Sequence, residues 1–182
     1  MCVIEPRVFR DDRGYFKEIY EQNRYLQAGI KLSFVQDNIS RSRENTLRGL
    51  HYQIQHPQGK LVQVLRGEIF DVAVDLRRDS ATFGKWVGEL LSEDNHRQLY
   101  IPPGFAHGFL TLNGPADVLY KCTDFYCPES ERTLIWNDPD LGIAWPRMSG
   151  LIISEKDAQG LPLAECVCYE DSSQLSTHLP GD

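Results

Sequence analysis

The 182-residue sequence contains no apolar run that approaches the length of a membrane span. A charged segment follows the first residues almost at once, so we expect no signal peptide. The five cysteines are an odd number without disulfide-framework spacing, which predicts reduced thiols in the cytoplasm. Basic residues are outnumbered, and the net charge of −7 argues against nucleic acid or a membrane surface as the main partner. A small anionic ligand stays possible.

Composition and length predict one domain. The apolar share of 41% and the charged share of 25% are those of an ordinary globular protein. A chain of this length accommodates one sizeable core. After about residue 165 the sequence becomes polar and loses its periodicity. We therefore expect a single domain over residues 1–165 and a C-terminal tail of unknown role over residues 166–182.

Strand patterns dominate the sequence, and helical patterns are scarce. Short segments rich in β-branched and aromatic residues are separated by Gly, Pro, Asn and Ser, which favours an all-β sandwich or barrel. The expected strands are residues 60–66, 69–75, 86–91, 97–101, 108–112 and 116–123. Only residues 21–28, which precede Gly29, and residues 154–157, with Ser154 as N-cap, suggest short helices.

Two histidines lie where cupin barrels hold a metal, but the ligand set is incomplete. The segment 103–109 makes a tight turn that delivers His107 to the start of a strand. An earlier strand in metal cupins supplies His-x-His, whereas here His51 is followed by Gln53 at the second position. Two histidines and an uncertain carboxylate form a poor metal site, so we predict none.

A histidine without a metal is suited to proton abstraction, because imidazole titrates near neutral pH. Such a base needs a partner that fixes its tautomer. For His51 the candidate carboxylates are Asp71, Asp75 and Asp157. The alternative for His51 is a hydrogen-bonded residue of the core. Asp71 interrupts an apolar strand, and it faces either the barrel lumen or solvent on an edge strand.

Further side chains have a functional and a structural interpretation. Tyr120 and Tyr126 share a face if their strand is unbroken, where a phenol can donate a proton or simply pack against other aromatic groups. Arg13, Arg48 and Lys60 can bind a diphosphate or remain surface charges.

Strict alternation puts Arg48 and His51 on opposite faces of one strand. A shared pocket therefore requires a bulge or bend at Gly49.

Eight segments, taken together, resemble one family. They occur in order and at near-family spacing between about residues 3 and 163: residues 11–16, 34–38, 47–53, 59–62, 67–75, 101–109, 136–139 and 154–157. This arrangement is similar to the dTDP-4-dehydrorhamnose 3,5-epimerase family. The resemblance implies a homodimeric cupin-type double-stranded β-helix, or jelly-roll barrel, with a few short helices. It also implies a small-molecule substrate, dTDP-4-dehydro-6-deoxy-D-glucose, and no cofactor.

The resemblance assigns roles by position. His51 matches the family's base, Asp157 its carboxylate partner, Tyr120 the proton donor on the other face of the sugar, and Lys60 the lysine near the C4 oxygen. Further positions match residues that line or adjoin the nucleotide-sugar site: Arg13, Phe16, Glu18, Gln36, Asn38, Arg48, His107, Tyr126, Glu131 and Lys156.

Other functions are distinguishable by experiment. A monofunctional 3- or 5-epimerase of a related nucleotide 4-keto sugar is expected to exchange protons at one carbon only. A metal-dependent cupin oxygenase is expected to contain stoichiometric iron and to lose activity to chelators. A catalytically silent sugar-binding barrel is expected to bind dTDP-sugars without proton exchange.

Overall fold

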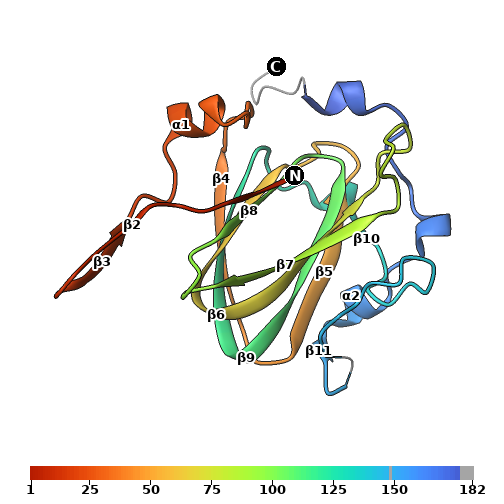
Figure 1. Cartoon of the computed structure of the whole chain (residues 1–182). Coiled ribbons are helices and arrows are strands. Elements are labelled where there is room, and N and C mark those ends of the chain that lie inside the picture. The colour runs from red at the N-terminus through yellow and green to blue at the C-terminus, as the bar shows by residue number, and fades with distance from the viewer. Residues whose placement is uncertain (148, 177–182) are drawn as a thin grey trace.

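A computed structural model describes residues 1–147 and 149–176 of the chain. Most of the strands form one nine-stranded sheet that is wrapped into a barrel (Figure 1). Its path runs β1 (Cys2–Ile4), β8 (Gln98–Ile101), β6 (Lys60–Asp75), β9 (Phe105–Cys122), β5 (Thr46–Gln53) and β10 (Glu131–Thr133). Three strands pair off this path: β4 (Gln36–Ser42) with β9, β7 (Trp86–Ser92) with β6, and β11 (Ile152–Ile153) with β5. The predicted all-β barrel is confirmed.

Two long bent strands hold the barrel together. β6 pairs with β9 along almost its whole length, with register shifts between Val64 and Glu68. The sequence suggested a turn at Gly67 and two shorter strands, and this was wrong. Gly67 instead sits at the irregularity with a φ of 82°, and a Cβ there would collide with the carbonyl oxygen of Pro115. The segments predicted at 108–112 and 116–123 are likewise one strand, β9.

Side chains alternate between two apolar clusters. Ile69 and Ala73 of β6 pack in the lumen with residues such as Phe109, whereas Val72 and Val74 belong to a second cluster on the opposite face. Described residues between 134 and 175, including those of β11, cover that outer face (Figure 1). Asp71 has the lumen parity and is fully buried, so the solvent-facing alternative for it is excluded.

The helices are short. α1 (Gln22–Gln27) is capped by Glu21, and Gly29 follows with a φ of 92°, as the sequence predicted. α2 (Glu155–Ala158) begins after Ser154, whose hydroxyl accepts the Asp157 N–H, so the predicted N-cap is confirmed. The 3₁₀ turns are Pro128–Ser130, Leu163–Glu165 and Ser172–Ser176. No helix among the described residues is long and apolar enough to cross a membrane.

Neither end of the described chain is a simple extension of the barrel. β2 (Val8–Asp11) and β3 (Gly14–Lys17) form a separate hairpin that projects from the barrel (Figure 1). The C-terminal segment, expected as a tail from residue 166, packs against the barrel in its described part. Cys166, Cys168, Tyr169 and Leu175 are buried in the outer cluster. Residues 177–182 of the expected tail lie outside the described residues.

Candidate active site

A bulge in β5 brings Arg48 and His51 to the same cavity. The pairing of β5 with β9 shifts register between these two residues. Gly49 lies between them with a φ of 103°, and a Cβ there would come within 2.5 Å of the His107 carbonyl oxygen and 2.6 Å of Gly108 Cα. Only glycine fits this close approach of two backbones. The irregularity that the sequence analysis required at Gly49 is therefore present.

His51 is paired with Asp157, and not with the other carboxylates considered. The His51 Nε2 to Asp157 Oδ1 distance is 2.6 Å, and Asp157 Oδ2 accepts the Gly49 N–H at 3.2 Å. Burial acts to raise the pKa of Asp157, but hydrogen bonds from His51, Gly49 and Ser154 outweigh it, and the net pKa is lowered. An ionised Asp157 holds the proton on Nε2 and leaves the His51 Nδ1 lone pair free.

Glu131 lies on the free side of the imidazole. Its Oε1 is 3.9 Å from His51 Nδ1, while its Oε2 accepts the Tyr126 hydroxyl at 2.7 Å and also pairs with the Lys156 ammonium. Burial acts to raise the pKa of Glu131, but Lys156 and Tyr126 lower it further than burial raises it. The hydrogen bond to Glu131 in turn raises the pKa of Tyr126 to about 12. A carboxylate at this place can stabilise an imidazolium on His51.

Tyr120 and Lys60 come from the two long strands. Tyr120 pairs with Asn38 of β4 and Val62 of β6, and Lys60 pairs with Cys122. Burial raises the pKa of Tyr120, which keeps its phenol protonated. Burial also lowers the pKa of Lys60, and no carboxylate among the described residues pairs with its ammonium. Lys60 is therefore free to donate hydrogen bonds to a bound ligand.

The cavity has two adjoining lobes of about 270 and 310 Å³ that share His51, Lys60 and Tyr120. One lobe is also lined by Gln36, Asn38, Tyr126 and Glu131, and the other by Arg48, His107, Lys156 and Asp157. The two lobes share a base, a cation and a phenol. The first lobe adds amides, a second phenol and the Glu131 carboxylate, and the second adds two cations, Arg48 and Lys156, beside Asp157. This mixture of polar and charged groups suits a charged sugar conjugate.

Polar contacts order both lobes. Gln36 donates to Asn38 at 3.0 Å and accepts the Tyr126 N–H at 2.9 Å, while Arg48 Nε donates to Ser42 at 2.8 Å. Tyr126 lies beyond the end of β9, yet it faces the same cavity as Tyr120. The interpretation of these tyrosines as cavity residues therefore fits better than aromatic packing.

His107 has its own carboxylate. Its Nε2 lies 2.9 Å from Asp71 Oδ2 in a buried pair, and burial lowers the pKa of His107 despite this partner. The two histidines are thus attached to different carboxylates. Among residues 1–147 and 149–176, no group of three or more His, Cys, Asp or Glu side chains is arranged to hold a metal ion.

Three predicted site residues are outside this cavity. Arg13 and Phe16 belong to the projecting hairpin, where Arg13 pairs with Asp11 at 2.6 Å and Phe16 is 69% exposed. Glu18 pairs with Arg24 at 2.7 Å. A single chain does not bring them to His51.

Other cavity residues were missed by the sequence analysis. Strand alternation from His51 could have indicated Gln53, and the strand start could have indicated Phe105, since both line the first lobe. Tyr169 also lines this lobe, but it lies within the segment that was interpreted as a tail, and no sequence signal identified it.

Comparison with known proteins agrees with this geometry. The family model for dTDP-4-dehydrorhamnose 3,5-epimerase matches residues 1–165. The Pseudomonas aeruginosa dTDP-4-dehydrorhamnose 3,5-epimerase is 58% identical over 170 residues, covering 93% of this chain and 94% of the relative. The structure of the Legionella pneumophila dTDP-6-deoxy-D-glucose-3,5-epimerase with dTDP-4-keto-L-rhamnose superimposes with a TM-score of 0.91 at 51% identity, covering 93% and 92% of the two chains.

A more distant neighbour has a narrower activity. ChmJ, a 3'-monoepimerase from Streptomyces bikiniensis in complex with dTDP-quinovose, has a TM-score of 0.83 at 33% identity, covering 89% and 83% of the two chains. The predicted cupin-type jelly-roll fold is confirmed by these likenesses. With the family model spanning most of its length, this chain belongs to the dTDP-4-dehydrorhamnose 3,5-epimerase family.

Proposed function

We propose that the protein is an isomerase that inverts C3 and C5 of dTDP-4-dehydro-6-deoxy-D-glucose and yields dTDP-4-dehydro-L-rhamnose for dTDP-rhamnose biosynthesis. One observation carries this proposal: His51, oriented by Asp157 at 2.6 Å, shares a cavity floor with Lys60 and Tyr120. Family membership supplies the substrate class.

The chemistry follows from the C4 ketone. The ketone acidifies the hydrogens at C3 and C5, so one base beside it can form an enolate toward either carbon. His51 Nδ1 takes the proton, and the imidazolium is stabilised by Asp157 and Glu131. Lys60 donates to the enolate oxygen. Tyr120 returns a proton from the opposite face of the ring, and the configuration is inverted.

The rest of the substrate occupies the two lobes. Arg48, on the cationic side, suits the diphosphate, and Gln36 and Asn38 offer hydrogen bonds to the nucleoside portion. No step in this scheme requires a metal or another cofactor.

A second copy of the chain completes the site in this proposal. The hairpin that bears Arg13 and Phe16 makes its own two-stranded sheet, and it exposes aromatic side chains, with Phe9 48% and Tyr15 50% exposed. Exposed apolar groups on a projecting hairpin favour insertion into a partner. We therefore place Arg13, Phe16 and Glu18 of one protomer beside the cavity of the other in a homodimer.

A reducing compartment fits the thiols. All five cysteines are free, and Cys122, Cys166 and Cys168 are buried. Free buried thiols are typical of cytoplasmic proteins, and we place the reaction there.

Product analysis tests the reaction. The purified protein is incubated with dTDP-4-dehydro-6-deoxy-D-glucose, and the ring coupling constants of the product are read by proton NMR. Inversion at both carbons is expected. Inversion at C3 alone would instead indicate a 3-epimerase like ChmJ, and an unchanged substrate that binds tightly would indicate a silent sugar-binding protein.

A further inference from the structure

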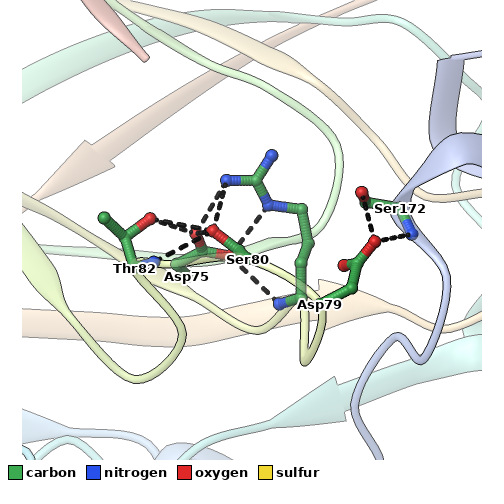
Figure 2. Close-up of polar contacts among 6 residues, drawn as sticks. Asp75, Asp79, Ser80, Thr82 and Ser172 are labelled. Atoms are coloured by element: carbon green, nitrogen blue, oxygen red, sulfur yellow. Dashed lines mark hydrogen bonds and ion pairs between the residues drawn. The ribbon is translucent and has the colours of Figure 1, made fainter.

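The C-terminal segment 166–176, which follows the part of the chain matched by the family model, is fixed to the loop between β6 and β7. Tyr169 N–H donates to the Leu76 carbonyl at 3.0 Å, and Arg78 N–H donates to the Tyr169 carbonyl at 2.8 Å. Asp79 Oδ2 accepts the Ser172 N–H at 3.1 Å and the Ser172 hydroxyl at 2.8 Å (Figure 2). Both backbone and side-chain contacts therefore hold this segment in place.

The loop that receives the segment is itself organised by a buried carboxylate. Asp75 is 1% exposed and accepts hydrogen bonds from Ser80 and Thr82 (Figure 2). It also accepts hydrogen bonds from the Arg77 guanidinium. The Arg77 guanidinium lies over the Phe105 ring at 4.7 Å, and Phe105 lines the first lobe of the cavity. The loop that receives the C-terminal segment is thus in direct contact with the wall of the cavity.

Tyr169 connects the segment to the cavity. Its ring lines the first lobe, and its buried hydroxyl donates to the Gln53 carbonyl at 2.5 Å. The Gln53 side chain has all its hydrogen-bonding groups engaged: Nε2 donates to the carbonyls of His56 and Phe125, and Oε1 accepts the Cys127 N–H at 2.9 Å. These contacts bracket Tyr126 on both sides.

We infer that Tyr169 and Gln53 are positioning residues, which hold the 125–127 segment so that Tyr126 forms the wall of the dTDP-sugar cavity. The inference rests on the proposed function for the identity of the ligand. Gln53 occupies the strand position where metal cupins hold a second histidine. In this chain Gln53 instead holds the 125–127 segment in place. Through this contact the C-terminal segment affects substrate affinity.

The first test is independent of the ligand. Hydrogen exchange of the Tyr126 and Cys127 amides is compared in the wild type, Tyr169→Phe and Tyr25→Phe. Tyr25→Phe is a matched control, because the Tyr25 hydroxyl donates to Gln98 and the Ile19 carbonyl and does not line the cavity. Faster exchange is expected in Tyr169→Phe only. Unchanged protection of these amides in Tyr169→Phe would overturn the inference.

The second test measures affinity for dTDP-glucose, which lacks the ketone and cannot be enolised. Calorimetry should show binding weakened roughly three- to tenfold in Tyr169→Phe, the loss expected for one neutral hydrogen bond. Gln53→Glu keeps the acceptor for Cys127 but removes both donors, and it should weaken binding similarly. KM should rise while kcat stays near the wild-type value.

A double-mutant cycle separates positioning from general loosening. In a Tyr126→Ala background, Tyr169→Phe should cause no further loss of dTDP-glucose affinity, because its effect passes through Tyr126. Losses that simply add would contradict the assignment. If the wild type bound no dTDP-glucose, the proposed function would fail. The hydrogen-exchange experiment would still show whether Tyr169 holds the 125–127 segment in place.

Discussion

The role proposed for His51 as a base depends on the groups that hold its ring. Asp157 fixes the proton on Nε2, and Glu131 lies 3.9 Å from the free Nδ1. Removing the imidazole removes the group that takes the proton from C3 and C5 in the proposed scheme. We expect His51→Ala to lower deuterium exchange at both C3 and C5 by about 10³-fold, as is usual for loss of a general base. Exchange is followed by proton NMR and folding by circular dichroism. Exchange at the wild-type rate at either carbon would contradict the assignment.

Tyr120 should affect inversion and not abstraction. Without its hydroxyl, His51 can still remove a proton and return a deuteron on the same face. Tyr120→Phe is therefore expected to exchange C3 and C5 while forming inverted product about 10²-fold more slowly, most of all at C5. The control is Tyr25→Phe, which removes a hydroxyl outside the cavity. Normal inversion in Tyr120→Phe would remove this residue from the acid role.

In the proposed scheme Asp157 acts through His51. An amide in its place offers Nδ2–H or a neutral oxygen to Nε2, and it no longer stabilises an imidazolium. Asp157→Asn should lower kcat roughly 10²-fold with a small effect on KM. Steady-state kinetics measures both constants. A wild-type kcat would show that His51 does not depend on this carboxylate.

The loop between β6 and β7 provides a stability test. Burial acts to raise the pKa of Asp75, but hydrogen bonds from Arg77, Thr82 and Ser80 outweigh it and lower the pKa to about 2. A carboxylate whose folded pKa lies below its unfolded value of about 3.9 stabilises the fold above that pH, and the stabilisation is lost as pH falls toward 2.

We expect Asp75→Asn to lower the free energy of unfolding by about 2 kcal/mol at pH 7. The difference in free energy of unfolding between the variant and the wild type should become smaller as pH falls from 5 toward 2. Denaturant unfolding across this range measures it, with the exposed Asp140→Asn as control. A difference in free energy of unfolding that stays constant with pH would mean that ionised Asp75 does not stabilise the loop.

Some features of the helices and strands could be predicted from the sequence, and others could not. Ser154 as N-cap and the irregularity at Gly49 were predictable, because capping and close backbone approach depend on local residue types. The continuity of β6 through Gly67 was not predictable. A glycine that begins a turn and a glycine that forms a bulge have the same local sequence, and pairing with β9 decides between them.

At the scale of the whole molecule, the resemblance identified site residues that one chain does not unite. His51, Lys60, Tyr120 and Asp157 converge, because strand pairing within the chain places them together. Arg13 lies on the projecting hairpin, away from this cavity, and the place proposed for it in a site depends on a second copy. The packing of Tyr169 could not be predicted from the sequence, because the few buried side chains of this segment lie among polar residues along the chain.

Mixed dimers test the exchange of hairpins. We combine Arg13→Ala protomers with His51→Ala protomers by refolding them together. If Arg13 reaches across, the mixed dimer contains one site with both residues intact, and activity should reappear from two impaired parents. Light scattering confirms the dimer. If each chain used its own Arg13, the mixture would stay as impaired as its parents.

The most direct test of the account is proton NMR of the protein with dTDP-4-dehydro-6-deoxy-D-glucose in heavy water, without added metal. A base at the floor of one cavity and an acid across the ring predict that deuterium enters at both C3 and C5. Exchange at one carbon only, or at neither, would contradict the double epimerisation proposed for this chain.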